Sequence, residues 1–302
     1  MKGIAQKLLI GTSVLVGTIT ASAPALAGSL TGANIDPTEP YLIYDTVACG
    51  ISTSGICTEL SNTASAQDVL DNLGNVELSG STSTSGAADF TNRTTLNGIV
   101  DGSAITLSSL NAADWFGAGN TTTSYGDNNF ANDWFNDALA ASGVNSTLLL
   151  AAGYTSTADF FNDFRDSGGF ERFSDPNVAS VEGDGNGGLE IVLAGHFDAT
   201  AQLVPFLSPQ QQAALAMFAG PIQISEVVKV TYNGVTSFQY GFSATPSGIV
   251  EVSDEVSHNG NYTLSQVYNT DEPEGVPEPS TILGLMAIGG LVAASKRKSE
   301  KA

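Results

Sequence analysis

Basic side chains are scarce in this chain of 302 residues, which has 10 Lys and Arg against 31 Asp and Glu. Between residues 28 and 277 there are only four: Arg93, Arg165, Arg172 and Lys229. All acidic residues except Glu278 and Glu300 lie in this segment, so its net charge is about −25. Nucleic-acid binding requires clustered Lys and Arg to neutralise phosphates, and we therefore expect no nucleic-acid partner.

The chain also lacks an apolar run of the roughly 20 residues that a membrane-spanning helix needs. The first of its two shorter runs, 8–20, follows Lys2 and Lys7 and precedes Ala25-Leu26-Ala27. A positive start, a short apolar stretch and an A-x-A site are the three parts of a secretory signal peptide. We predict that the export machinery and signal peptidase process the chain, with cleavage after Ala27.

The second short run lies near the C-terminus. Pro277-Glu278-Pro279 and Ser280 precede fourteen uncharged residues, 281–294, and then the basic cluster 296–298. A fourteen-residue helix is about 21 Å long, short of the roughly 30 Å hydrocarbon core. The positive-inside rule keeps the basic cluster in the cytoplasm, so the body of the chain lies on the far side of the membrane, in agreement with the signal peptide.

This tail, V-P-E-P-S-T-I-L-G-L-M-A-I-G-G-L-V-A-A-S-K-R-K, resembles the PEP-CTERM sorting signal that exosortases recognise. The resemblance implies cleavage by a membrane-embedded cysteine protease near Pro277, Glu278 and Pro279, and a location in the envelope, at the surface or in the matrix of an exopolysaccharide-producing bacterium. Exosortase is then a partner, and exopolysaccharide a further candidate partner. A plain anchor that is never cut is the alternative.

These signals divide the chain into five parts. We expect a signal peptide at 1–27, an exported domain at 28–269 and an acidic, Pro-rich spacer at 270–280. A hydrophobic sorting helix, 281–295, and a basic cytoplasmic tail, 296–302, follow. The tail helix would hold the chain transiently in the inner membrane.

Cysteine and histidine are also rare, with two residues of each type. Cys49 and Cys57 are both in the exported part, where an oxidising compartment favours a disulfide. His196 and Asp198 fall on one face of an expected strand, a conceivable base and orienting acid, although a histidine in an apolar strand is more often a core residue. Because the motifs G-x-S-x-G, H-E-x-x-H and the P-loop are missing, we predict no catalytic residue and no cofactor.

The periodicity predicts an α+β fold, mainly antiparallel sheet with a helical insert at about 128–168. Helices are expected at 63–73, 129–142, 146–152, 157–166 and 208–219. Strands are expected around 41–44, at 76–79, 91–100, 103–110, 178–181, 189–197, 222–232, 235–242, 249–252 and 262–268. Asn233-Gly234 is the strongest hairpin signal.

Aspartates stand beside aromatic residues in three clusters, 114–116, 133–137 and 159–163. Exposed Trp115 and Trp134 beside carboxylates would suit stacking on sugar rings, and paired carboxylates would suit glycoside hydrolysis. The competing interpretation places the aromatic rings in the core and the acids in water, and we favour it. Whether the two tryptophans are exposed or buried distinguishes the two interpretations.

The segment 182–188, E-G-D-G-N-G-G, offers oxygen ligands for calcium, with Asp184 and Asn186 as weak candidates. A hairpin turn explains the same residues, so no metal site is predicted. We expect an exported surface or extracellular-matrix protein without catalytic activity. The alternatives are a carbohydrate-binding module or weak glycoside hydrolase of the envelope, and a calcium-dependent adhesion protein. Arg165 and Arg172 most simply form salt bridges, with an anion site as the other possibility.

Overall fold

The computed structural model describes residues 28–49, 55–78, 90, 93–205, 207–209, 211–212 and 221–268. The signal peptide, the spacer, the Pro-Glu-Pro motif, the sorting helix and the basic tail all lie outside these residues, as does most of the helix expected at 208–219. Within the described part of the chain, no helix is long and apolar enough to cross a membrane.

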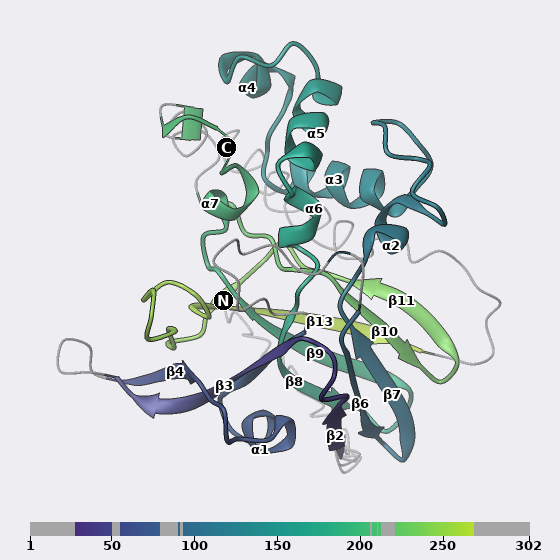
Figure 1. The fold of residues 1–302 in the computed structure, drawn as a ribbon, viewed down its shortest axis with the longest axis vertical. Coiled ribbons are helices and arrows are strands. Elements are labelled where there is room, and N and C mark those ends of the chain that lie inside the picture. Colours follow the sequence, from purple (N-terminus) through teal and green to yellow (C-terminus); the bar gives the residue numbers. More distant parts are fainter. Residues whose placement is uncertain are drawn as a thin grey trace, which may run out of the picture.

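Two antiparallel sheets form the lower part of the molecule in Figure 1. The larger has eight strands, in the order β12-β13-β9-β8-β5-β3-β4, with β1 paired to β8. The smaller has five, in the order β11-β10-β7-β6-β2. The strands are β1 (Gly28–Ser29), β2 (Thr31–Ile35), β3 (Tyr41–Ala48), β4 (Ile56–Leu60), β5 (Asn75–Leu78), β6 (Thr95–Val100), β7 (Ser103–Ser108), β8 (Asn177–Gly183), β9 (Gly188–Gly195), β10 (Val228–Tyr232), β11 (Val235–Gln239), β12 (Thr245–Pro246) and β13 (Gly260–Val267).

The two sheets share one hydrophobic core. Alternate residues of each strand face it, as the two-residue repeat of a strand requires: Val228, Val230 and Tyr232 from the smaller sheet are buried, while Lys229 and Thr231 are not. From the larger sheet, Ile191 and Tyr262 join the same cluster. The pairings within both sheets are antiparallel, so the predicted antiparallel character is confirmed, and the alternation gives each sheet one face toward the core.

Tight turns set the register of the smaller sheet. Asn233 and Gly234 both have positive φ, 51° and 79°, and pair Tyr232 with Val235 across the turn. Asp101 and Gly102, with φ of 51° and 78°, make the same kind of turn between β6 and β7. Two successive residues with positive φ match the twist of antiparallel strands, which explains the Asn-Gly and Asp-Gly pairs.

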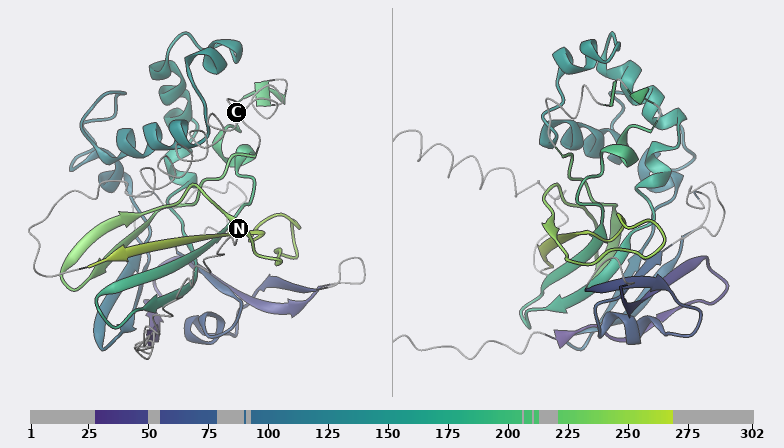
Figure 2. Two further views of the ribbon diagram at one scale, coloured as in Figure 1. Left: turned by 180° about the vertical axis from the view of Figure 1, so that it is seen from behind. Right: turned by 90° about the vertical axis from the view of Figure 1, so that its left-hand side faces the viewer.

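Helices gather at one end of the sheets (Figure 2). They are α2 (Ala112–Phe116), α3 (Phe130–Ala141), α4 (Ser146–Ala151), α5 (Thr157–Asp166) and α6 (Gly169–Arg172), joined by α7 (Thr200–Leu203). A second hydrophobic cluster, rich in aromatic rings, forms their core. The predicted helical insert is confirmed, although its first helix, α2, begins at Ala112 and not near 128. The short helix α2 escaped prediction because one turn shows no helical period; a capping box of Asn111 and Asp114 defines its start.

A further helix, α1 (Ala66–Leu70), packs beside β2 and β5. It starts at the Ser65–Asp68 capping box and is shorter than the 63–73 predicted. Strands β1, β2, β4 and β12 were not predicted, and the strand expected at 222–232 begins only at Val228. The strand expected at 249–252 was wrong, because this segment contributes only a single parallel bridge, between Thr58 and Glu251. The backbone around Ile249 is instead held by the side chain of Ser247, whose hydroxyl oxygen accepts the N–H of Ile249 at 3.0 Å.

Candidate functional site

The processing residues predicted from the sequence cannot be placed in the fold. Ala25 and Ala27 at the signal peptidase site, and Pro277, Glu278 and Pro279 at the sorting motif, lie outside the described residues. The described ranges end at residue 268. Candidate sites in the body must therefore be judged on the folded domain alone.

Cys49 and Cys57 form the expected disulfide, with their Cα atoms 5.1 Å apart. The bond links the two strands of the β3–β4 hairpin, where Val47 is the register partner of Cys57. Cys57 itself is buried. The environment is that of a structural bridge at the end of a hairpin, as the sequence suggested.

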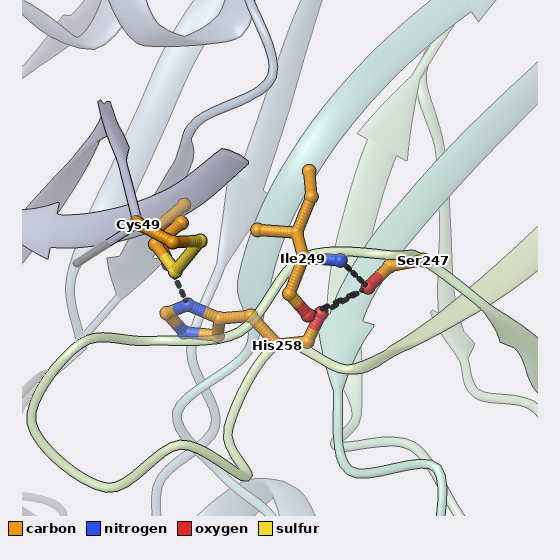
Figure 3. The surroundings of a disulfide bond; sticks show 6 residues. Cys49, Ser247, Ile249 and His258 are labelled. Carbon is orange, nitrogen blue, oxygen red and sulfur yellow. Dashed lines mark hydrogen bonds between the residues drawn. A yellow bond between two sulfur atoms is a disulfide. The ribbon is translucent and has the colours of Figure 1, made fainter. Parts of the chain in front are cut away.

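The loop between β12 and β13 packs against this hairpin through His258 (Figure 3). The Nδ1 atom of His258 lies 2.8 Å from Oγ1 of Thr58, next to the disulfide, and its ring meets that of Tyr44 edge-on. Ser247 donates to the carbonyl oxygen of His258. Burial lowers the pKa of His258 to about 4, so the ring is neutral near pH 7.

His196, the other histidine, does not pair with Asp198 as a base and orienting acid. Asp198 accepts hydrogen bonds from the backbone and hydroxyl of Thr200, and His196 Nε2 lies 3.3 Å from the amide of Gln202. Burial lowers the pKa of His196. The arrangement is that of a polar residue satisfied inside the fold, in agreement with the favoured interpretation.

Trp115 and Trp134 are fully buried, each with 0% of its surface exposed. Their ring centroids are 5.4 Å apart, and Phe170 lies within 6.0 Å of both. Trp115 donates its indole N–H to Ser174. Neither ring reaches solvent, so neither stacks on a sugar, and the aromatic part of the acid–aromatic clusters belongs to the core.

The acids of these clusters have structural partners. Asp114 accepts from Arg93 and forms ion pairs with both Arg93, at 2.6 Å, and Lys229, at 3.0 Å. Although burial raises its pKa, these bonds outweigh that effect and leave it lowered. Asp133 is exposed, whereas Asp137 is half-buried and accepts from Tyr240, 2.8 Å away. Asp133 and Asp137, four residues apart on α3, are thus not equally exposed, because Tyr240 covers Asp137.

The weak calcium candidates, Asp184 and Asn186, sit in the turn between β8 and β9. Oδ1 of Asp184 accepts the backbone N–H groups of Asn186, at 2.7 Å, and Gly188, at 2.8 Å. Asp101 accepts the N–H of Gly185. These bonds form a closed turn between β8 and β9, the interpretation that the sequence favoured for these residues over calcium binding.

Arg165 pairs with Asp166 at 2.7 Å and donates to a backbone carbonyl. Arg172 donates to the carbonyl oxygens of Ser167 and Gln202, at 2.6 and 3.0 Å. The simpler expectation of salt bridges thus holds for Arg165, whereas Arg172 is held by backbone carbonyls. The anion site stays a prediction.

A cluster that the sequence did not reveal contains Glu77, Asp175 and Glu226, which we call the carboxylate cluster. Three backbone contacts assemble it. Asn177 is the register partner of Glu77, Leu78 donates its N–H to the carbonyl of Pro176, and Val227 donates to Phe173. Two strands and the segment before β10 therefore meet at one place.

The side chains of the carboxylate cluster interact with one another and with neighbouring polar groups. Oε2 of Glu226 accepts the backbone N–H of Asn177 at 3.1 Å and its side-chain amide at 3.4 Å. Oε2 of Glu77 accepts the hydroxyl of Tyr44 at 3.2 Å. Glu77 and Asn177 alternate with Val76 and Val178, whose side chains face the core, so both lie on the opposite face of the sheet.

All three carboxyls hold protons more tightly than usual. Burial raises the pKa of Glu77 to about 7, with further repulsion from Glu251, and burial raises that of Glu226 to about 8, with further repulsion from Glu77. The pKa of Asp175 is also raised, by burial and then by repulsion from Glu226 and Glu77. Such shifted groups are typical of functional sites, and structural networks produce them too.

No local signal in the sequence marks these residues. They lie 98 and 51 positions apart along the chain. Each is a single acid in a chain rich in acids. The pairing of β5 with β8 and the bond from Val227 to Phe173 bring them together, and both depend on segments far apart in sequence.

Comparison with known proteins identifies one segment. The family model for the PEP-CTERM protein-sorting motif matches residues 275–298. No curated protein and no solved structure matches the chain. The match covers the Pro-Glu-Pro element, the apolar run and the basic residues that follow it, and it leaves the body unassigned. The chain therefore carries a C-terminal PEP-CTERM protein-sorting motif, which implies that it is an exported protein sorted to the cell surface by an exosortase.

Proposed function

We propose that this chain is a non-catalytic protein of the bacterial surface or extracellular matrix, released from its C-terminal helix by an exosortase. The observation that carries the proposal is the sorting motif at 275–298, with its apolar run too short for an ordinary anchor. Its body then acts outside the membrane as a folded, strongly acidic domain.

Two features of the body argue against the sugar-binding alternative. The aromatic rings that would line a sugar-binding groove, Trp115 and Trp134, are in the helical core. Of the carboxylates beside them, Asp114 bonds to Arg93 and Lys229, and Asp137 bonds to Tyr240. An envelope carbohydrate-binding module built on these residues is therefore disfavoured.

Processing at both ends is tested by intact mass spectrometry of the protein recovered from the envelope and from the medium. We expect a chain that begins at Gly28 and ends near Pro277, Glu278 and Pro279. A mass that retains residues beyond the motif in every fraction would contradict exosortase cleavage and favour a permanent anchor.

A matched pair of substitutions locates the recognition element. Glu278→Ala changes the acid inside the Pro-Glu-Pro motif, and Glu274→Ala removes an equal charge one residue before the matched segment begins at 275. We expect E278A to accumulate as the uncut form in the membrane and E274A to be processed normally. Equal processing of both variants would mean that the motif is not what the protease reads.

A further inference from the structure

Positive charge is so scarce in the segment 28–277 that every basic side chain can be located. Its four Lys and Arg residues are held by Asp114, by Asp166 or by backbone carbonyl oxygens. Cleavage after Ala27 would add a fifth positive charge, because it turns the peptide nitrogen of Gly28 into an α-ammonium group. The surroundings of Gly28 therefore decide what this charge contacts.

Gly28 lies against the carboxylate of Asp101, which belongs to the turn between β6 and β7. As the first residue of β1, Gly28 is the register partner of Gly183 in β8. A Cβ atom at Gly28 would overlap Oδ1 of Asp101, and a Cβ atom at Gly183 would overlap Oδ2. The carboxylate thus occupies the space that side chains at both positions would need, which favours glycine at each.

The α-nitrogen of Gly28 is close to this carboxylate. A Cβ position is about 2.5 Å from the nitrogen of its own residue, so the α-nitrogen lies within about 5 Å of Oδ1 of Asp101. Oδ2 accepts the backbone N–H of Gly185 at 2.8 Å, whereas no donor to Oδ1 is found in the described part of the chain. Asp101 therefore has one bonded oxygen and one available oxygen beside Gly28.

The other charges beside Gly28 are negative. Glu182 is the register partner of Ser29, and Asp184 follows Gly183 in the chain. Among the ion pairs of the described residues, no Lys or Arg binds Asp101, Glu182 or Asp184. The potential at this place therefore favours a cation, and the new amino terminus is the positive group that the chain brings there.

We propose that the α-ammonium group of Gly28 forms an ion pair with Oδ1 of Asp101 once signal peptidase has cut after Ala27. This inference rests on the amino-terminal cleavage that is part of the proposed function. Rotation about the Cα–C bond of Gly28 brings the ammonium group within hydrogen-bond distance of the carboxylate. In the uncleaved chain the same nitrogen is an uncharged amide, so the ion pair forms only after cleavage.

The ion pair joins the two sheets at the point where the chain crosses between them. Strand β1 belongs to the larger sheet and β2 to the smaller, and Leu30 between them donates its N–H to the carbonyl oxygen of Val181 in β8. Asp101 belongs to the smaller sheet, between β6 and β7. Removal of the signal peptide thus adds an electrostatic contact to this junction.

The test measures how fast the amino terminus of the exported protein reacts with limiting acetic anhydride at pH 7. Only the uncharged amine is a nucleophile, so an ion pair that holds the proton slows the reaction. We expect Asp101→Asn to react about two to five times faster than the wild type, the change that corresponds to an exposed ion pair. In guanidinium chloride that unfolds both proteins, the rates should be equal. Mass spectrometry of the amino-terminal peptide gives the rate and identifies the first residue.

Three variants separate the ion pair from other effects. Asp101→Asn removes the charge but keeps an acceptor for Gly185, and asparagine suits the positive φ of this turn. Gly28→Ala keeps the charge, but its methyl group displaces the carboxylate, so its native amino terminus should also react faster relative to its unfolded rate. Asp133→Asn, the control, removes an equal charge from an exposed residue of α3 and should react at the wild-type rate.

Equal rates for native wild type and D101N would overturn the proposal, as would a difference that persists in the denaturant. An equal acceleration in D133N would assign the effect to net charge instead. A mature chain that begins at a residue other than Gly28 would overturn the cleavage prediction together with the ion pair. A chain that begins at Gly28 with equal rates overturns the ion pair alone, and exosortase processing is measured separately at the other end of the chain.

Discussion

At the scale of single residues, His258 shows how the fold controls protonation. Its ring lies between Thr58 and Tyr44 and has 4% of its surface exposed. Asp254 on the same loop favours the charged form, while His196 and above all burial oppose it. The folded state therefore contains the neutral ring of His258, and protonation of this ring at low pH destabilises the fold.

We expect the free energy of unfolding to depend on pH through the protonation of His258. Its folded pKa, about 4, is below the roughly 6.5 of an unfolded histidine, so the unfolded state takes up a proton first as the pH falls. The stability contributed by the neutral ring is complete above about pH 6.5 and is lost as the pH falls toward about 4, a loss on the order of 3 kcal/mol.

The measurement is urea unfolding between pH 7.5 and 4 of the wild type and of His258→Asn. Asparagine tolerates the positive φ of 63° at this position and places an oxygen near the site of Nδ1. The free energy of unfolding of the wild type should fall more steeply below about pH 6.5 than that of H258N. Parallel curves would show that the histidine does not titrate on unfolding.

At the scale of elements, the β3–β4 hairpin is the part of the larger sheet that depends most on a covalent link. Strand β4 is the last strand in the order of the sheet, and beyond it the Thr58–Glu251 bridge provides the pairing. Ile56 and Leu60 on this strand are exposed, at 44% and 45%. Three of the five residues of β4 are exposed, so packing contributes little beyond Cys57 and Thr58, and the disulfide has a large share in holding the strand.

Removing the disulfide should therefore destabilise the protein by about 2.5 kcal/mol, the loop-closure value for so short a loop. The comparison is between the wild type and the double variant Cys49→Ser, Cys57→Ser in chemical denaturation. The same double variant should behave like the wild type after reduction. A variant as stable as the oxidised wild type would mean that β4 is held by its pairing with β3 and by the contacts of Thr58 with the 247–258 loop alone.

At the scale of the whole molecule, charge dominates. The segment 28–277 carries about −25, and its four basic residues are engaged in ion pairs or in bonds to backbone carbonyls. Repulsion among the remaining acids keeps such a protein soluble and works against the compact state. Two hydrophobic clusters, one between the sheets and one among the helices, counter this repulsion.

The folded state should consequently be stabilised by monovalent salt. Between about 10 mM and 150 mM sodium chloride, the Debye length falls from about 30 Å to about 8 Å, which screens most of the surface repulsion. We expect the melting temperature to rise over this range, because the repulsion is spread over the whole surface. A melting temperature that is flat or falls with salt would show that surface repulsion is not an important cost.

Local sequence determined much of the architecture. The helix at 157–166, the strands beside Asn233-Gly234 and the hairpin around 182–188 all appear where the periodicity and the turn residues place them. The Cys49–Cys57 link also follows from short spacing and an exported setting. These features depend on residues within about ten positions of one another, which is the range over which propensity, capping and turn chemistry act.

The sequence by itself also determined the sorting motif at 275–298, because a linear signal needs no fold to be recognised. Only the tertiary structure decided that Trp115 and Trp134 are buried, that 249–252 is not a regular strand, and that Glu77, Asp175 and Glu226 share one place. Each of these outcomes depends on which distant segments pair and which face each segment turns to the core. Pairing of distant strands is a property of the whole chain, and no local pattern encodes it.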